Sequence, residues 1–311
     1  MITIKNLIKD RSGNSTIVLM VAMTLIIGAS ALVTDAGMIY IEKTKLQNAV
    51  DAAALAGISA YSQGESAVIS EVYESAQLNK LDISTLNIQL MNSNRKITVE
   101  ASKKVNFYFA KIFNKTDAVV DARATAVIAP LVAVDGIKPL GVEQQQFVFG
   151  ATYVLKCGAG DGSNGNYGAL ALGGTGASNY KYNLIHGYHG DLETGDLVKI
   201  GYTLDTEPGN MEGPTYDAIR QIIESDYNTY TDLTRLPLDS PRLFTIPVVD
   251  DFDVSGRDTV TIVGFATFFI DDVVFRGGKT EITGKFIKTL GEGEIDEYSP
   301  DYGFYGIKLV E

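Results

Sequence analysis

The residues Asp251-Phe-Asp253-Val-Ser255-Gly256 place side-chain oxygens at alternate positions before a glycine. This pattern is typical of the first half of a calcium-binding loop, in which alternate oxygens point at the ion and the glycine allows a sharp turn. Ile262 stands where such a loop supplies its bidentate glutamate. An acidic turn between two strands explains the same residues, so Asp251, Asp253 and Ser255 form a calcium candidate beside that simpler interpretation.

Two histidines, His186 and His189, lie in the segment HGYHG. On a helical turn their spacing would allow two imidazoles to bind one metal ion, but the flanking glycines and the preceding YKYNLI indicate a strand and a turn. Because no cysteine or third histidine is near, surface histidines are the expectation. Cys157 is the only cysteine, which excludes an intrachain disulfide, and we expect it to be a small half-buried residue at a strand end.

The glycine-rich segment 158–174 could cradle a phosphate only if a lysine and a helix followed it, and the next lysine is Lys181. Acidic residues are frequent, as in Asp271-Asp272 and 292–297, yet no spacing pairs them as general acid and base. A Gly-x-Ser-x-Gly motif is also absent from the sequence. These patterns predict no enzyme activity, no small-molecule substrate and no cofactor other than the calcium candidate.

Length and charge narrow the class of protein. The 311 residues leave room for about two domains. The net charge is −12, which argues against nucleic acid as a partner. The 31 glycines and 16 tyrosines suit a loop-rich, β-rich exported domain better than a helical bundle.

The chain carries a membrane-spanning pattern near its N-terminus. Between Arg11 and Asp35 no residue is charged. As a helix this interval is ~35 Å long, which exceeds the ~30 Å of a bilayer core. The sequence therefore predicts a transmembrane helix over residues 14–34 in the cytoplasmic membrane. Because Lys5 and Lys9 accompany Arg11, residues 1–13 are expected on the cytoplasmic side and the rest of the chain outside.

A cleavable signal peptide is the alternative to an anchor. Ala29-Ser30-Ala31 has the small-x-small form of a cleavage site after Ala31, and it follows a basic region and an apolar run. Both interpretations export the C-terminal part of the chain.

The helix is predicted to continue without a break from about Ser15 to Tyr61, on the order of 70 Å. Ile39, Leu46, Val50, Ala53 and Gly57 share one face of this extension. The small residues of DAAALAG allow close helix packing, either against the chain's own exported part or against neighbouring subunits.

Residues 35–130 are expected to combine this helix extension with a small α+β unit. A second helix is predicted over Glu65–Asn79, and alternating patterns around the turn MNSNR predict a β-hairpin. A further strand should place Val105, Phe107 and Phe109 on one face, and the strand after it should end at Pro130.

Residues 131–311 are expected to form a mostly β exported domain with a helix from Glu212 to about Asp226. The predicted strands there are Phe244–Val249, Asp258–Phe269, Val273–Phe275, Thr280–Leu290 and Phe304–Val310, with another in FVFGATYVLKC. The predicted fold class is therefore α+β: a long N-terminal helix, a small α+β unit and a β-rich domain.

The segment DAGMIYIEKTKLQNAVDAAALAG directly after a membrane helix, followed by a hairpin and by ARATAVIAP, resembles the TadE/TadG-like family of tight-adherence (Flp) pilus-assembly proteins. The resemblance covers roughly residues 10–130. It implies a single-pass membrane protein without enzyme activity, with pilin or other pilus-assembly subunits as partners and self-association left open. The positions that match, taken as the partner-interface residues, are Asp35, Gly37, Leu46, Gln47, Asp51, Ala52, Ala53, Leu55 and Ala56.

The sequence departs from the pilin-like relatives at one place. They are processed after a glycine that has glutamate at the fifth following position, whereas Gly13 is followed there by Val18. This argues against cleavage near Gly13 and against a polymerising pilin. A surface adhesin with the same anchor, using the loops of residues 158–234 for binding, is the alternative function.

Overall fold

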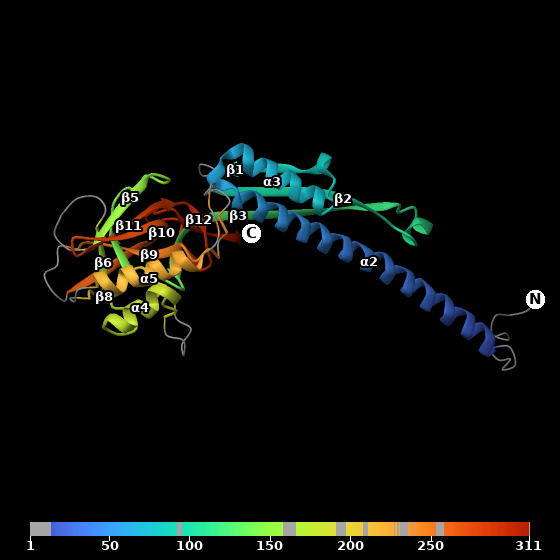
Figure 1. Cartoon of the computed structure of the whole chain (residues 1–311). Helices are drawn as coiled ribbons and strands as arrows, with labels where there is room; N and C mark the ends of the chain where they lie inside the picture. The colour runs from blue at the N-terminus through green and yellow to red at the C-terminus, as the bar shows by residue number, and fades with distance from the viewer. Residues whose placement is uncertain are drawn as a thin grey trace, which may run out of the picture. The chain divides into compact units, whose positions relative to one another are not determined.

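The computed structural model describes residues 14–91, 95–157, 166–190, 197–207, 211–226, 228, 230, 236–237, 239–252 and 258–310. The chain forms two compact units (Figure 1). Unit 1 comprises the residues up to Val127 and those from Leu309, and unit 2 comprises Ile128–Lys308. The expected α+β class, with a long N-terminal helix and a β-rich C-terminal part, is confirmed.

The helices of unit 1 are α2 (Asn14–Ser59), α3 (Glu65–Leu78) and the short 3-10 helices η1 (Tyr61–Gln63), η2 (Ile83–Thr85) and η3 (Ala110–Phe113). Its strands are β1 (Asn87–Met91), β2 (Lys96–Asn106) and the first part of β3 (Asp117–Val134). The three strands pair antiparallel in the order β1-β2-β3.

The single helix α2 has two different surroundings. Its N-terminal half exposes apolar side chains, such as Leu19, Leu25 and Ile27, each more than half exposed. A helix that is apolar on all sides and uncovered is typical of a membrane span. Among the described residues, α2 is the one helix long and apolar enough to cross a membrane. Its C-terminal half instead buries a stripe that includes Leu46 and Val50.

The core of unit 1 lies between α2, α3 and the sheet. Helix α3 buries Val68, Val72 and Ala76, which recur at every fourth position and so share one face. Ile97 and Val99 of β2 are fully buried. Figure 1 shows β2 and β3 as a long hairpin that extends beside α2.

Two predicted strands near this hairpin have different bounds in the structure. The predicted alternation through Val105, Phe107 and Phe109 is wrong beyond Asn106, where β2 ends and the chain turns into η3. The following strand was expected to end at Pro130, but β3 continues to Val134. The carbonyl of Pro130 accepts a bond from Asp296 N–H, so a residue without an N–H group still contributes to pairing at this position.

Unit 2 contains the helices α4 (Ala177–His186) and α5 (Glu212–Ser225). Its strands are the end of β3, β4 (Leu140–Glu143), β5 (Thr152–Cys157), β6 (Asn166–Ala169), β7 (Val198–Lys199), β8 (Thr203–Asp205), β9 (Leu243–Val249), β10 (Thr259–Arg276), β11 (Lys279–Ile287), β12 (Thr289–Leu290), β13 (Glu294–Ile295) and most of β14 (Phe304–Val310). One of the two sheets lies wholly within unit 2 and has the order β11-β5-β6-β4-β9-β10-β8, in which β11 also pairs with β10. The end of β3 pairs with β7 and β13, and β12 runs parallel to β14.

Helices α4 and α5 pack together, and α5 lies against β10 and β11 (Figure 1). The expected helix at Glu212 is confirmed as α5. The strand and turn expected for YKYNLI are wrong, because this segment forms α4. Tyr180, Asn183 and Leu184 are buried there at helical spacing, and tertiary packing of this face outweighs the local glycine signals.

Two further strand predictions change in unit 2. The two strands predicted from Asp258 to Phe275 are one strand, β10, with a register shift between Ile270 and Asp272. The strand predicted over Thr280–Leu290 is divided into β11 and β12, which pair with different neighbours. A bulge and a change of partner depend on pairing across the sheet, which local alternation does not record.

Candidate functional site

Asp35 connects the helix to the turn between β2 and β3. It is the first charged residue after the uncharged half of α2, and it is only 3% exposed. Its carboxylate accepts hydrogen bonds from three consecutive backbone N–H groups, those of Tyr108 (2.8 Å), Phe109 (3.0 Å) and Ala110 (2.6 Å). Charge-assisted bonds of this kind are stronger than neutral ones, so Asp35 holds this turn against α2.

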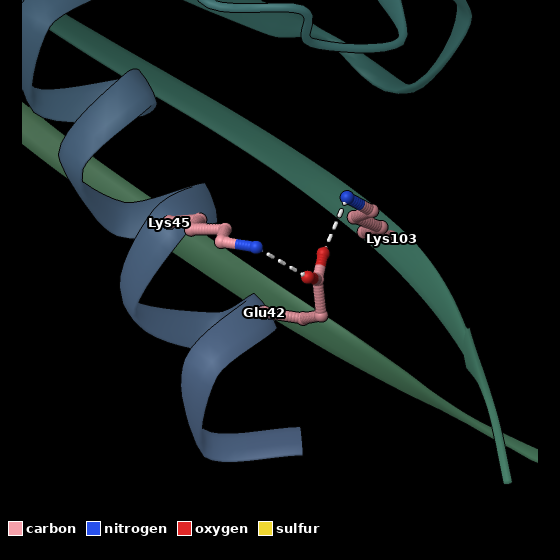
Figure 2. Close-up of polar contacts among 3 residues, drawn as sticks. All are labelled: Glu42, Lys45 and Lys103. Carbon is pink, nitrogen blue, oxygen red and sulfur yellow. Dashed lines mark hydrogen bonds and ion pairs between the residues drawn. The ribbon is translucent and has the colours of Figure 1, made fainter. Parts of the chain in front are cut away.

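Glu42 lies two turns further along the helix than Asp35 and connects α2 to strand β2. Its carboxylate lies between Lys45 Nζ at 2.9 Å and Lys103 Nζ at 2.6 Å, as Figure 2 shows. Hydrogen bonds from Lys103 and Lys45 lower the pKa of the Glu42 carboxyl, against the opposing effect of its burial. Both lysines are largely exposed, so solvent weakens each pair to at most about 1 kcal/mol.

Gln47 makes a third polar link. Its side-chain amide donates to Asp51 Oδ1 and to the backbone carbonyl of Arg123 on β3, both at 2.8 Å. Arg123 in turn lies 3.4 Å from Glu100 on β2. Gln47 therefore contacts the sheet of unit 1, and Asp51 accepts a hydrogen bond from Gln47 on the same helix.

The residues of the helix extension that were expected to allow close packing lie mostly against other parts of unit 1. Leu46 and Ala53 are buried, whereas Ala52, Leu55 and Ala56 are half-buried. Gly57 lies where a Cβ atom would be 2.3 Å from Val72 Cγ2. The close packing that the small residues allow thus occurs between α2 and α3 of the same chain.

A different face of the helix extension is open. Gly37 has no atom within 4 Å of the place where a Cβ would lie. Tyr40 and Ile41 follow on the same side at helical spacing and are 73% and 47% exposed. Of the residues predicted to contact partners, Gly37 is therefore the one that lies on an uncovered surface.

The calcium candidate is only partly within the described residues. Asp251 is exposed, and its N–H donates to Asp250 Oδ1 at 3.0 Å, as expected of an acidic turn. Asp253 and Ser255 lie outside the described residues. Within the part of the chain that the structure describes, no three histidine, cysteine or acidic side chains are grouped to hold a metal ion.

The two histidines have separate surroundings. His186 ends α4 with its ring 4.5 Å from that of Tyr182, and His189 Nδ1 lies 2.9 Å from Asp135 Oδ2. Both are exposed, as expected from the sequence. Cys157 is the last residue of β5, and within the glycine-rich segment 158–174 the described backbone begins at Asn166.

Sequence reasoning missed one ionisable group with an unusual environment. Lys138 is 9% exposed, donates to the Ile185 carbonyl at 2.9 Å and lies 5.2 Å from the centre of the Phe244 ring. Burial lowers its pKa to about 8. The amino group points into unit 2, where it contacts a carbonyl and a ring.

Asp35, Glu42 and Gln47 make three separate polar contacts between α2 and the β2–β3 hairpin, here together named the polar seam. Its chemistry is that of positioning one element against another. Of the residues that make these contacts, sequence analysis singled out Asp35 and Gln47 but not Glu42, and neither Lys103 nor the turn after β2. The sequence does contain a pattern that could have pointed to the sheet side of these contacts: the segment 101–116 holds four lysines and no acidic residue.

One family model matches the chain, that of the family described as "Putative Flp pilus-assembly TadE/G-like", over residues 13–62. The match covers α2 and continues into η1. The resemblance found from the sequence is confirmed over this segment. No curated protein and no solved structure matches the chain.

Proposed function

We propose that the protein is a membrane-anchored structural or assembly component of a Flp-type pilus, or of a related export apparatus, that presents its β-rich unit outside the cell membrane. One observation carries this proposal. The segment that matches the pilus-assembly family coincides with a single continuous helix, of which one half is apolar and uncovered and the other half is built into unit 1.

The orientation follows from charge. Lys5, Lys9 and Arg11 precede the apolar half of α2, and basic residues beside a membrane helix favour the cytoplasmic side. The N-terminus is therefore inside, and the part of the chain after Thr34, including all of unit 2, is extracytoplasmic.

Only some of the residues that match the family motif are exposed enough to contact a partner. Leu46 and Ala53 are already buried within unit 1, whereas Gly37, Tyr40 and Ile41 share an open face of α2. A glycine beside apolar side chains lets a second helix approach closely. A helix of a pilin or pilus-assembly subunit fits this face.

Affinity purification of the full-length protein from membranes of its own cells, with identification of the co-purifying chains, tests the function. We expect pilin or pilus-assembly subunits with the wild type, most of them lost with Gly37→Leu and retained with Lys43→Ala, an exposed neighbour. Space around Gly37 allows the leucine without disturbing unit 1. Purification of the wild type without any such subunit would contradict the proposal.

A further inference from the structure

The turn between β2 and β3, residues 107–115, is here named the hairpin tip, and it carries a cluster of uncovered apolar side chains. Tyr108 is 66% exposed, Phe109 41%, Ile112 79% and Phe113 80%. Large apolar side chains grouped in this way on a surface mark a contact site for another molecule or for lipid.

The hairpin tip is also basic within an acidic protein. The segment 101–116 contains Lys103, Lys104, Lys111 and Lys115 and no aspartate or glutamate, although the whole chain has a net charge of −12. Lys103 and Lys104 pair with Glu42 and Asp117. The two lysines within the tip itself, Lys111 and Lys115, are exposed.

Contacts between α2 and the hairpin show beside which part of the helix the hairpin tip lies. Ile97, at the start of β2, is near Gly57 of the helix, and Lys103 reaches Glu42. The tip then binds Asp35 through three backbone N–H groups. Strand β2 therefore runs along α2 toward its apolar half, and the tip is the part of the hairpin nearest to it.

We propose that the hairpin tip is a second membrane contact, which inserts its aromatic and apolar side chains into the interface of the leaflet at the Asp35 end of the membrane helix. Asp35 immediately follows the uncharged residues 14–34, so a bilayer that surrounds those residues must end close to the tip. Aromatic side chains favour this interface, and lysines beside them bind anionic headgroups. The inference rests on the proposed membrane anchoring.

A contact at two points restrains unit 1 more than a single helix does. A lone spanning helix rotates about its axis and changes its tilt, whereas interfacial aromatic and basic anchors set both. The tip would therefore fix which face of α2, including Gly37 and Tyr40, is turned toward a partner in the same membrane.

The test uses the absence of tryptophan from the chain, which allows single-tryptophan variants of the full-length protein. Phe113→Trp reports on the hairpin tip, and Leu25→Trp reports on the middle of the apolar helix. Met91→Trp is the control, because Met91 pairs with Lys96 at the other end of β2, ~33 Å from Asn106 along the strand. Each variant is reconstituted in vesicles of phosphatidylcholine and phosphatidylglycerol with bromine near the headgroup end or near the methyl end of the acyl chains.

We expect the emission of Phe113→Trp to fall roughly two-fold with the shallow bromine and less with the deep one, as for an interfacial residue. Leu25→Trp should show the opposite preference, and Met91→Trp should be unaffected. If Leu25→Trp is not quenched, the proposed anchoring itself fails. If Leu25→Trp is quenched and Phe113→Trp is not, the anchoring stands and the tip contact is overturned. A blue-shifted but unquenched emission from Phe113→Trp would also overturn it, because it would show that protein and not lipid covers the tip.

The lysines are tested in the same system. Adding Lys111→Glu and Lys115→Glu to Phe113→Trp should reduce the quenching in vesicles that contain phosphatidylglycerol and change it little in pure phosphatidylcholine. An equal effect in both lipids would overturn the role assigned to the headgroup charge.

Discussion

Gly57 and Gly37 lie on the same helix, but their surroundings are opposite. A Cβ at Gly57 would meet Val72 Cγ2 at 2.3 Å and the Val68 backbone oxygen at 3.2 Å, whereas a Cβ at Gly37 meets nothing within 4 Å. By helix propensity alone, both glycines are expected to weaken the helix. Only the structure shows that one of them is required by packing.

This contrast predicts opposite effects of the same substitution. Gly57→Ala should lower the free energy of unfolding by about 1–3 kcal/mol, because the clash outweighs the gain in helix propensity. Gly37→Ala should raise it by roughly 0.5–1 kcal/mol. Chemical denaturation of the full-length protein in detergent measures both, and equal effects at the two positions would be inconsistent with the packing of α2 against α3.

Glu42 gives unit 1 a defined dependence on pH. Its pKa is lower in the folded state than its ordinary value of 4.5, so the unfolded state binds the proton more readily. The stability from its contacts with Lys103 and Lys45 is therefore complete above pH 4.5 and is lost as the pH falls through the lowered pKa.

We expect Glu42→Gln to lower the unfolding free energy by about 0.5–1 kcal/mol at neutral pH and to match the wild type in acid. Melting curves as a function of pH measure the difference. Glu74→Gln, on the exposed side of α3, is the control and should follow the wild type at every pH. A difference at Glu42 that persists unchanged in acid would show that the carboxylate charge is not responsible.

At the scale of elements, the β2–β3 hairpin depends on Asp35 for the shape of its tip. The carboxylate holds the N–H groups of residues 108–110, and Asn114 takes a left-handed conformation (φ 58°) where η3 ends. We expect Asp35→Asn to speed hydrogen exchange of these three N–H groups ~10-fold, because the amide accepts fewer and weaker bonds.

Asp51→Asn is the matched control for this measurement. Asp51 is also a carboxylate on α2, but it accepts its hydrogen bond from the Gln47 side chain, on the same helix. Hydrogen exchange followed by mass spectrometry should show faster exchange at the tip for Asp35→Asn alone. Unchanged exchange in that variant would mean that the turn is held by other contacts.

The elements that could be predicted from the sequence are those whose apolar residues recur with a clear helical or strand period. The helix around Leu46 and Val50, the helix at Glu65 and the hairpin at MNSNR have apolar residues at periods that one element can satisfy by itself. The elements that differed depend on distant residues. Phe107 and Phe109 alternate like a strand, yet the carboxylate of Asp35 draws the chain into a turn there.

At the scale of the whole molecule, the sequence was most informative over residues 13–62, where the family match lies. Uncharged length and basic flanks predict the anchor from general physical rules. Asp35 and Gln47 could be singled out from the sequence, but Glu42, Lys103 and the tip could not, because these contacts join segments more than 60 residues apart. For unit 2, neither α4 nor the buried Lys138 could be identified from local patterns.

The central claim is that the apolar half of α2 anchors the protein in a membrane and leaves the rest of unit 1 after Thr34, and all of unit 2, outside. Alkaline extraction of membranes, combined with protease added to cells whose inner membrane is intact, tests it most directly. We expect the full-length protein to stay in the membrane pellet and unit 2 to be digested from outside. A variant lacking residues 14–34 should not be retained in the pellet. Release of the full-length protein by alkali, or protection of unit 2 from the protease, would contradict the account.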